Sequence, residues 1–176
     1  MEKKENILLK NTLNYGAIIG FTLIIYSLIL YFFNLILNPY LNYINHVIIF
    51  IGILYGIRSY RDNVLGGFIK YGQAMGAGTL MSVFASVLFG IYTFLLYEYM
   101  DPDLIERTLA VVEEGLQATD LPDSQIELTM RITRKITVPP VLAFVELFNK
   151  TFWGVLFSLI ISAILKREGD PFTEQL

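Results

Sequence analysis

The residues with the clearest chemical potential are an acid, a base and a histidine in otherwise apolar sequence. Glu146 and Lys150 stand four positions apart in the stretch 141–165, so a helix would place them side by side. His46, the single histidine of the chain, lies in a separate apolar stretch. Charged groups within a membrane span are costly and usually face the interior of a helix bundle. These three residues form the candidate buried polar cluster. Three asparagines are expected at a comparable depth: Asn42, Asn45 and Asn149.

Two interpretations of this cluster remain open on sequence alone. A histidine beside a carboxylate can titrate near neutral pH. The cluster would then line the path of a small transporter or proton-linked channel. Alternatively, the ion pair neutralises itself and His46 forms hydrogen bonds that hold the helices together. The second role is structural and needs no ligand.

Other kinds of catalytic or binding site have no support in the sequence. The chain has no cysteine and one histidine, so no usual zinc ligand set can be assembled. No glycine-rich phosphate loop follows a strand, and no serine sits in a nucleophile elbow. We expect no catalytic residue, cofactor or metal, and therefore not an enzyme. Basic patches interleaved with aromatic residues are also missing, so we expect no nucleic-acid partner.

Four long apolar stretches must position the polar cluster. Hydrophobic residues make up 55% of the 176-residue chain and charged residues only 16%. A bilayer core about 30 Å thick is crossed by roughly 20 apolar residues in a helix. We therefore predict an all-α, polytopic protein with four transmembrane helices in a bundle, forming a single membrane domain over residues 1–176 in contact with the lipid bilayer. The expected spans are 13–37, 40–57, 71–97 and 141–165.

The basic residues predict the orientation of the four spans. Lysine and arginine favour cytoplasmic segments close to a span. Eight of them flank the expected inner ends: Lys3, Lys4, Lys10, Arg58, Arg61, Lys70, Lys166 and Arg167. The connection around Asn38 and Pro39 has none, and the segment 98–138 is rich in acid. Both termini are thus expected in the cytoplasm, with the acidic segment outside.

Small residues recur every four positions along the expected spans. Such rows let membrane helices pack closely. The candidate helix-packing seam comprises Gly16, Gly20, Gly52, Gly56, Gly72, Gly76, Gly78, Ser82, Ser86, Gly90, Gly154 and Ser158. A tight four-helix bundle explains these rows, and self-association is the alternative. The pattern Tyr-Gly-x-x-x-Gly opens both the first and the third span, at Tyr15 and Tyr71, which leaves open an internal duplication.

The outer segment 98–138 is predicted to be mainly helical. Asp101, Pro102 and Asp103 are typical of a helix start. An apolar stripe follows, and it is the candidate partner surface: Ile105, Leu109, Val112 and Leu116. Residues 125–138 alternate apolar and polar, which would suit a strand. Because no partner strand is evident, a second amphipathic helix is favoured.

Three short stretches resemble a known family. They are Gly52-Ile53-Leu54-Tyr55-Gly56-Ile57-Arg58 with Arg61-Asp62, then Ile69-Lys70-Tyr71-Gly72-Gln73-Ala74, and Tyr99-Met100-Asp101-Pro102-Asp103. The chain resembles, over roughly residues 10–165, a bacterial membrane family known as domain of unknown function 4199. The resemblance implies four spans with a helical outer segment between the third and fourth, in the bacterial cytoplasmic (inner) membrane. It supplies no activity and no site residues.

Two functional hypotheses follow. The first is a non-enzymatic component that assembles with itself or with a membrane protein partner, through its small-residue seams and outer segment. The second is a small transporter or proton-linked channel that uses Glu146, Lys150 and His46. The sequence names neither a substrate nor a partner.

Overall fold

A computed structural model describes residues 2–167 of the chain, with side chains from residue 8 onward. The side chains of Lys3 and Lys4 lie outside the described part, as does the segment 168–176. The order of elements is α1 (Glu2–Phe32), α2 (Pro39–Ser59), a π-helical turn η1 (Tyr60–Val64), α3 (Tyr71–Leu95), a second π-helical turn η2 (Leu96–Met100), α4 (Leu104–Gln117), α5 (Asp123–Ile136) and α6 (Pro139–Leu165).

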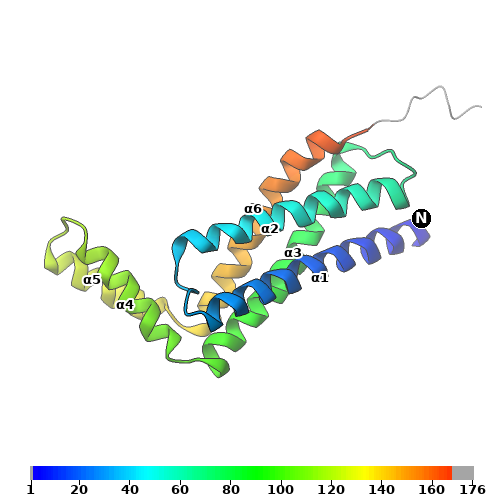
Figure 1. Ribbon diagram of the computed structural model, residues 1–176. Coiled ribbons are helices and arrows are strands. Elements are labelled where there is room, and N and C mark those ends of the chain that lie inside the picture. The colour runs from blue at the N-terminus through cyan, green and yellow to red at the C-terminus, as the bar shows by residue number, and fades with distance from the viewer. Residues whose placement is uncertain (1, 168–176) are drawn as a thin grey trace, which may run out of the picture.

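Four of the helices are long and apolar enough to cross a membrane. They cover Leu8–Phe32, Pro39–Val64, Tyr71–Met100 and Pro139–Leu165. The prediction of an all-α bundle with four transmembrane helices is therefore confirmed, and the chain is a multi-pass membrane protein. The four helices run side by side, as Figure 1 shows. The N-terminus and the end of α6 lie at one end of the bundle, the terminus end. The α1–α2 turn and the α4–α5 hairpin lie at the other, the hairpin end.

The boundaries of the first two spans differ from those expected. The first helix ends at Phe32 and not at Leu37, because Asn34 takes a left-handed conformation with φ of 57° and breaks it. Pro39 opens α2 and does not terminate α1. Proline fits the first turn of a helix, where its missing N–H would be unpaired. The Asn38 side chain caps α2 by accepting hydrogen bonds from the backbone N–H groups of Tyr40 and Leu41.

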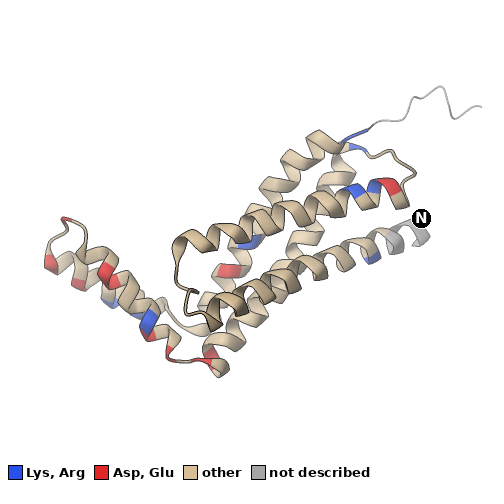
Figure 2. Ribbon diagram, in the orientation of Figure 1, with Lys and Arg blue, Asp and Glu red and all other residues tan. Residues whose placement is uncertain are grey.

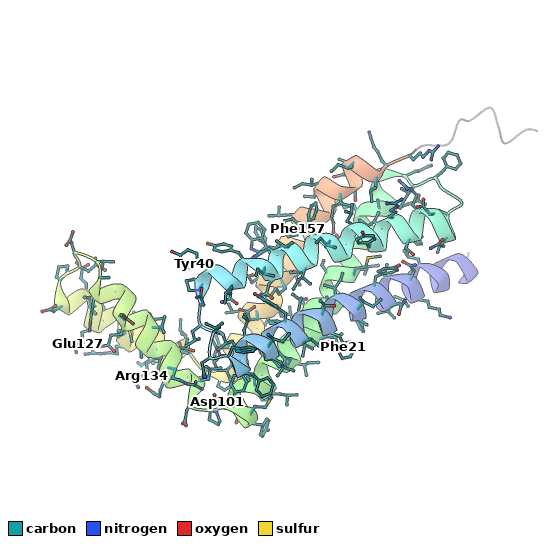
Figure 3. The ribbon with its side chains drawn as sticks, viewed as in Figure 1. Phe21, Tyr40, Asp101, Glu127, Arg134 and Phe157 are labelled. Carbon is teal, nitrogen blue, oxygen red and sulfur yellow. The ribbon has the colours of Figure 1, made fainter. Side chains whose placement is uncertain are left out.

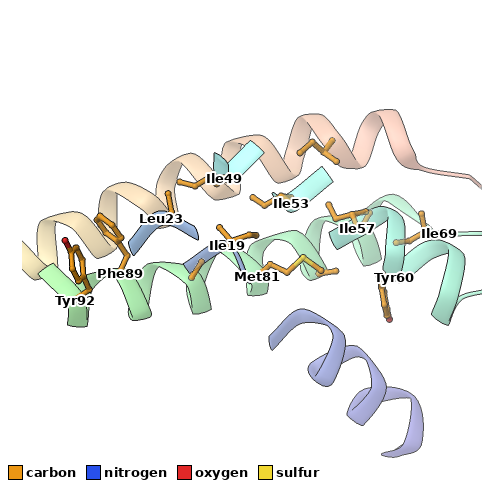
Figure 4. Close-up of a cluster of buried hydrophobic side chains, with 14 of the residues drawn as sticks. Ile19, Leu23, Ile49, Ile53, Ile57, Tyr60, Ile69, Met81, Phe89 and Tyr92 are labelled. Carbon is orange, nitrogen blue, oxygen red and sulfur yellow. The ribbon is translucent and has the colours of Figure 1, made fainter. Parts of the chain in front are cut away.

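Helix α3 is the centre of the bundle. It packs most extensively against α6 and α1, while α2 contacts α1, α6 and α3. Buried aliphatic residues from α1, α2 and α3, among them Ile19, Leu23, Ile53 and Met81, meet in one cluster (Figure 4). In a bilayer this packing gains dispersion energy and satisfied polar contacts, since lipid tails are as apolar as the side chains themselves.

Glycines permit the closest approaches between these helices. A Cβ on Gly16 would meet the Met81 carbonyl oxygen of α3 at 2.9 Å, and one on Gly78 would meet Ser158 Oγ of α6 at 2.5 Å. A Cβ on Gly154 would overlap the side chain of Ser82. Close approaches of the same kind occur at Gly20, Gly52, Gly56 and Gly90.

The second glycine pair of the repeated Tyr-Gly-x-x-x-Gly pattern has different surroundings. A Cβ on Gly72 or Gly76 would meet nothing within 4 Å, whereas Gly16 and Gly20 both lie against α3. The glycines of the first copy therefore contact another helix and those of the second copy do not, so the helix contacts do not follow the repeat in the sequence.

The segment between α3 and α6 folds into a helical hairpin. Residues 123–136 form α5, so the alternating apolar pattern belongs to a helix, as favoured, and not to a strand. Asp101 pairs with Arg107 and does not cap α4, which begins at Leu104 with no side-chain cap. Arg134 of α5 contacts Glu106 of α4 at 3.1 Å. Figure 3 shows the hairpin standing away from the bundle, with Glu127 and Arg134 on it.

Candidate functional site

A cavity of about 450 Å³ lies at the hairpin end of the bundle. Its walls come from α1, α2, α3, η2 and α6, and its rim from the α1–α2 turn and α4. The polar lining residues are Ser27, Asn42, Asn45, His46, Tyr92, Thr93, Tyr97, Thr108, Glu146, Asn149 and Lys150. The cavity therefore brings together the three residues of the predicted polar cluster and the three asparagines expected beside them.

Glu146 and Lys150 form an ion pair one helical turn apart. Lys150 Nζ lies 2.9 Å from Glu146 Oε2. No donor meets this carboxylate oxygen in hydrogen-bond geometry, so the contact is an ion pair without a hydrogen bond. The two side chains differ in exposure: 8% for Lys150 and 37% for Glu146. The ammonium is thus the deeper group, and the carboxylate stands between it and the open part of the cavity.

A second contact holds the Lys150 ammonium in place. Its Nζ lies 5.0 Å from the centre of the Phe89 ring on α3. A cation over an aromatic face is attracted by the ring's electron density, and the attraction grows when water is excluded. Counting from Pro139 at about 1.5 Å per residue, Lys150 is roughly 16 Å into the span, near the middle of a bilayer core about 30 Å thick.

His46 faces the same cavity from α2. Its ring packs edge-on against Trp153 of α6, with 4.9 Å between the ring centres. Neither ring nitrogen has a hydrogen-bond partner among the protein groups described. The aromatic contact therefore fixes the ring and leaves its polar atoms free for a ligand or water.

The cavity contains several buried polar atoms that lack protein partners. They are Asn45 Oδ1 and both nitrogens of His46. Buried polar atoms are nearly always hydrogen-bonded to protein or to ordered water. The amide oxygen of Asn45 can only accept hydrogen bonds, and a neutral imidazole has one acceptor and one donor nitrogen, so an occupant of this space must supply at least one donor. Water, or a ligand with N–H or O–H groups, meets that requirement.

The bundle is tightly closed on the terminus side of Lys150. The Ser86 and Thr151 hydroxyls are 2.7 Å apart across α3 and α6. One turn further, Gly154 sits against Ser82. Phe50 and Phe157 pack edge-to-face, with 5.5 Å between ring centres, and close the α2–α6 side. These contacts close the bundle between the cavity and the terminus end.

The comparisons with known proteins place the chain in a family. The family model described as "Protein of unknown function (DUF4199)" matches residues 14–167. The chain belongs to this family. No curated protein matches it. No solved structure matches it either. The resemblance found from the three sequence stretches is confirmed, and the cavity residues all lie within the part of the chain that the family covers.

Several lining residues were not anticipated from the sequence. Phe89, Tyr92 and Tyr97 are not among the residues that the sequence patterns indicated. In the fold they line the cavity from α3 and η2, together with Thr108 of α4. Phe89 and Thr93 lie three positions after Ser86 and Gly90 of the small-residue row, a helical spacing that places them on the same side of α3 as that row.

The predicted partner stripe on α4 has mixed surroundings. Leu109 is buried, and Ile105, Val112 and Leu116 are half-buried. Val112 also lines the cavity, next to Val111. This stripe thus contributes to contacts within the chain, and its role towards another protein stays a prediction.

Metal binding has no geometric support in the part of the chain that is described. Within residues 2–167 no three histidine, aspartate or glutamate side chains converge as a metal site would require. Glu146 pairs with a lysine, and a cation at this position would be repelled by the Lys150 ammonium.

Proposed function

We propose that the protein is a small, non-enzymatic transporter or proton-linked channel. In this proposal the structure represents a state open to the outside and closed towards the cytoplasm. The hairpin end then faces outwards and both termini are cytoplasmic, in the cytoplasmic membrane of a bacterium. The distribution of charge supports this orientation, because basic residues gather at the terminus end and the acids gather on the hairpin (Figure 2).

One observation carries the proposal. A cavity of about 450 Å³ reaches from the hairpin end to a buried lysine, and its wall contains the glutamate that pairs with this lysine and a histidine whose ring nitrogens have no hydrogen-bond partner. If the ion pair served only to hold the helices together, we would expect the polar atoms around it to have protein partners, since buried unpaired polar atoms cost free energy. Ionisable groups inside a membrane domain commonly mark ion and proton pathways.

The Glu146–Lys150 pair provides a physical way to couple proton uptake to a movement of α6 against α3. Protonation of Glu146 would leave the Lys150 ammonium without its counter-charge in a low-dielectric site, which is strongly unfavourable. Proton uptake therefore favours either release of the lysine proton or rearrangement of α6 against α3. On the terminus side of Lys150 the α3–α6 contact includes Gly78, Ser82, Gly154 and Ser158, so small residues bring the two helices close together there.

Proton flux in liposomes tests this proposal. Vesicles loaded with a pH-sensitive dye and given a potassium diffusion potential should acidify or alkalinise faster with the protein than without it. Glu146→Gln should reduce the flux to that of empty vesicles, while Glu146→Asp keeps part of it. Glu127→Gln on the hairpin, outside the cavity, is the matched control and should leave the flux unchanged. Wild-type flux equal to that of empty vesicles, or unaltered flux in Glu146→Gln, would contradict the proposal.

Assembly with another chain is the second candidate. The observation that favours it is an open face of α3, where Gly72 and Gly76 have nothing within 4 Å and Leu80, Val83 and Val87 are exposed. Glycines on such a face allow a second helix to approach closely. Cross-linking mass spectrometry on native membranes tests this candidate. Links from this face to another chain would support it, and a monomer with internal links alone would leave transport as the sole candidate.

A further inference from the structure

The α4–α5 hairpin presents an apolar stripe that the chain itself leaves uncovered. Leu128, Ile132 and Ile136 are each 55% exposed. Their spacing of four residues places them on one side of α5. The other apolar residues of α5, Ile126 and Met130, are half-buried. No residue of α5 is fully buried, so this helix is held by few contacts within the chain.

The direction of the hairpin relates the stripe to the bilayer. Figure 1 shows the hairpin running sideways from the end of the bundle, not continuing the direction of the spanning helices. Since the spans cross the membrane, a hairpin running sideways at their end extends along the membrane surface. An amphipathic helix in that position usually buries its apolar side about 5–10 Å into the boundary between headgroups and acyl chains.

The stripe is also continuous with the lipid-facing side of the bundle. Only Thr137 and Val138 separate α5 from α6, and Val138 is 38% exposed. The exposed side of α6 then begins with Val141 and continues through Phe144 and Phe148, which are 63% and 64% exposed. The apolar surface thus passes from a spanning helix, which lipid must cover, onto α5 without a polar interruption on the exposed side.

The charges of α5 fit a headgroup layer. Its three basic residues, Arg131, Arg134 and Lys135, all lie in the half nearest to α6, while Asp123 and Glu127 lie in the other half. Arg131 pairs with Glu127 and Arg134 with Glu106. Lys135 stands next to Ile136 and has no ion-pair partner among residues 8–167. A lysine with an apolar stem at this position can reach lipid phosphate while the stripe stays in the acyl region.

From these observations we infer that the α4–α5 hairpin lies on the outer surface of the membrane, with Leu128, Ile132 and Ile136 inserted between lipid headgroups. The occupant of the stripe is lipid, not a second protein. Insertion of the stripe into lipid is independent of the transport proposal, whereas the assignment of this surface as the outer one rests on the proposed orientation. It also explains how α4, whose Thr108, Val111 and Val112 line the cavity, is held over the cavity rim although the hairpin has few contacts with the bundle.

Fluorescence quenching at two single cysteines tests the inference. The natural chain has no cysteine, so Ile132→Cys and Glu127→Cys each give one labelling site. The two positions are about 140° apart around the helix, at 3.6 residues per turn. Each variant is labelled with an environment-sensitive fluorophore and placed in nanodiscs of phosphatidylcholine and phosphatidylglycerol. Lipid carrying a nitroxide near the headgroup and aqueous iodide serve as the two quenchers.

The inference predicts opposite behaviour at the two sites. The label at residue 132 should emit at shorter wavelength, be quenched by the nitroxide lipid and be shielded from iodide, while the label at residue 127 should be quenched by iodide. Iodide quenching at residue 132, or equal lipid quenching at both sites, would overturn it. Shielding of residue 132 from both quenchers, together with cross-links between hairpins, would assign the stripe to a protein partner and would also overturn it.

Discussion

Gly154 of α6 lies directly against Ser82 of α3, so closely that a methyl group on Gly154 would overlap the serine side chain. This contact closes the bundle just below the cavity, one turn beyond Lys150. It is also the centre of the most extensive helix–helix contact in the fold, between α3 and α6.

Gly154→Ala should therefore destabilise the bundle. Adding a methyl group to a closely packed contact typically costs about 1–3 kcal/mol, which exceeds the gain of up to about 1 kcal/mol from replacing a helical glycine. Thermal unfolding in detergent, followed by helical circular dichroism, measures the change. Gly76→Ala is the control, since a Cβ there meets nothing within 4 Å, and it should be neutral or slightly stabilising. Equal stability of the two variants would show that α3 and α6 are not packed as described.

The two members of the ion pair should respond unequally to removal. Glu146→Gln leaves a buried Lys150 ammonium without its counter-charge, whereas Lys150→Met leaves a carboxylate that is already 37% exposed. Breaking a fully buried pair costs about 3–5 kcal/mol, and the exposure of Glu146 lowers that value here. We expect Glu146→Gln to be the more destabilising single change and the double variant to recover part of the loss. Denaturant unfolding of all four forms measures the coupling, and strictly additive effects would contradict a direct interaction.

The orientation of the bundle gives a third prediction. Asp120→Cys at the hairpin tip should react with a membrane-impermeant maleimide on intact cells, because the proposed orientation places the acidic hairpin outside. Asn63→Cys, beside the basic residues at the end of α2, should react only after permeabilisation. The reverse pattern would place the cavity opening on the cytoplasmic side.

The sequence patterns correctly predicted the elements that depend on residues close together in the chain. Apolar stretches of sufficient length identified all four spans, and Glu146 and Lys150 were paired by their four-residue spacing. The end of α1 was misplaced, because Asn34 breaks the helix through its own conformation while the apolar sequence continues to Leu37. In α5 the alternating residues fall within the broad apolar side of a helix, so alternation alone was ambiguous.

The cavity depends on features that no local pattern contains. Its walls come from α1, α2, α3, η2 and α6, and its rim includes α4, so the cavity follows from how separate helices are placed. Phe89 under the Lys150 ammonium, and Tyr92 and Tyr97 beside it, could be recognised only once α3 and α6 were brought together. His46 and Glu146 were placed at similar depth from the sequence, but the unpartnered ring nitrogens of His46 appear only in the fold.

The central claim is that the cavity is open to water from outside as far as the middle of the span. Thiol labelling at two neighbouring positions of α6 tests it most directly. Asn149 lines the cavity, while Phe148 is 64% exposed and is not a lining residue. Both lie roughly 15 Å into the span, and a thiol reacts as its thiolate, which needs a polar, wet environment.

The account predicts rapid labelling of Asn149→Cys by a membrane-impermeant methanethiosulfonate added outside, and no labelling of Phe148→Cys under the same conditions. Protection of both cysteines would show that the cavity is filled by lipid or closed. Equal labelling of both would show that α6 does not present these residues to different surroundings. Either result would contradict an outward-open polar cavity that ends at Lys150.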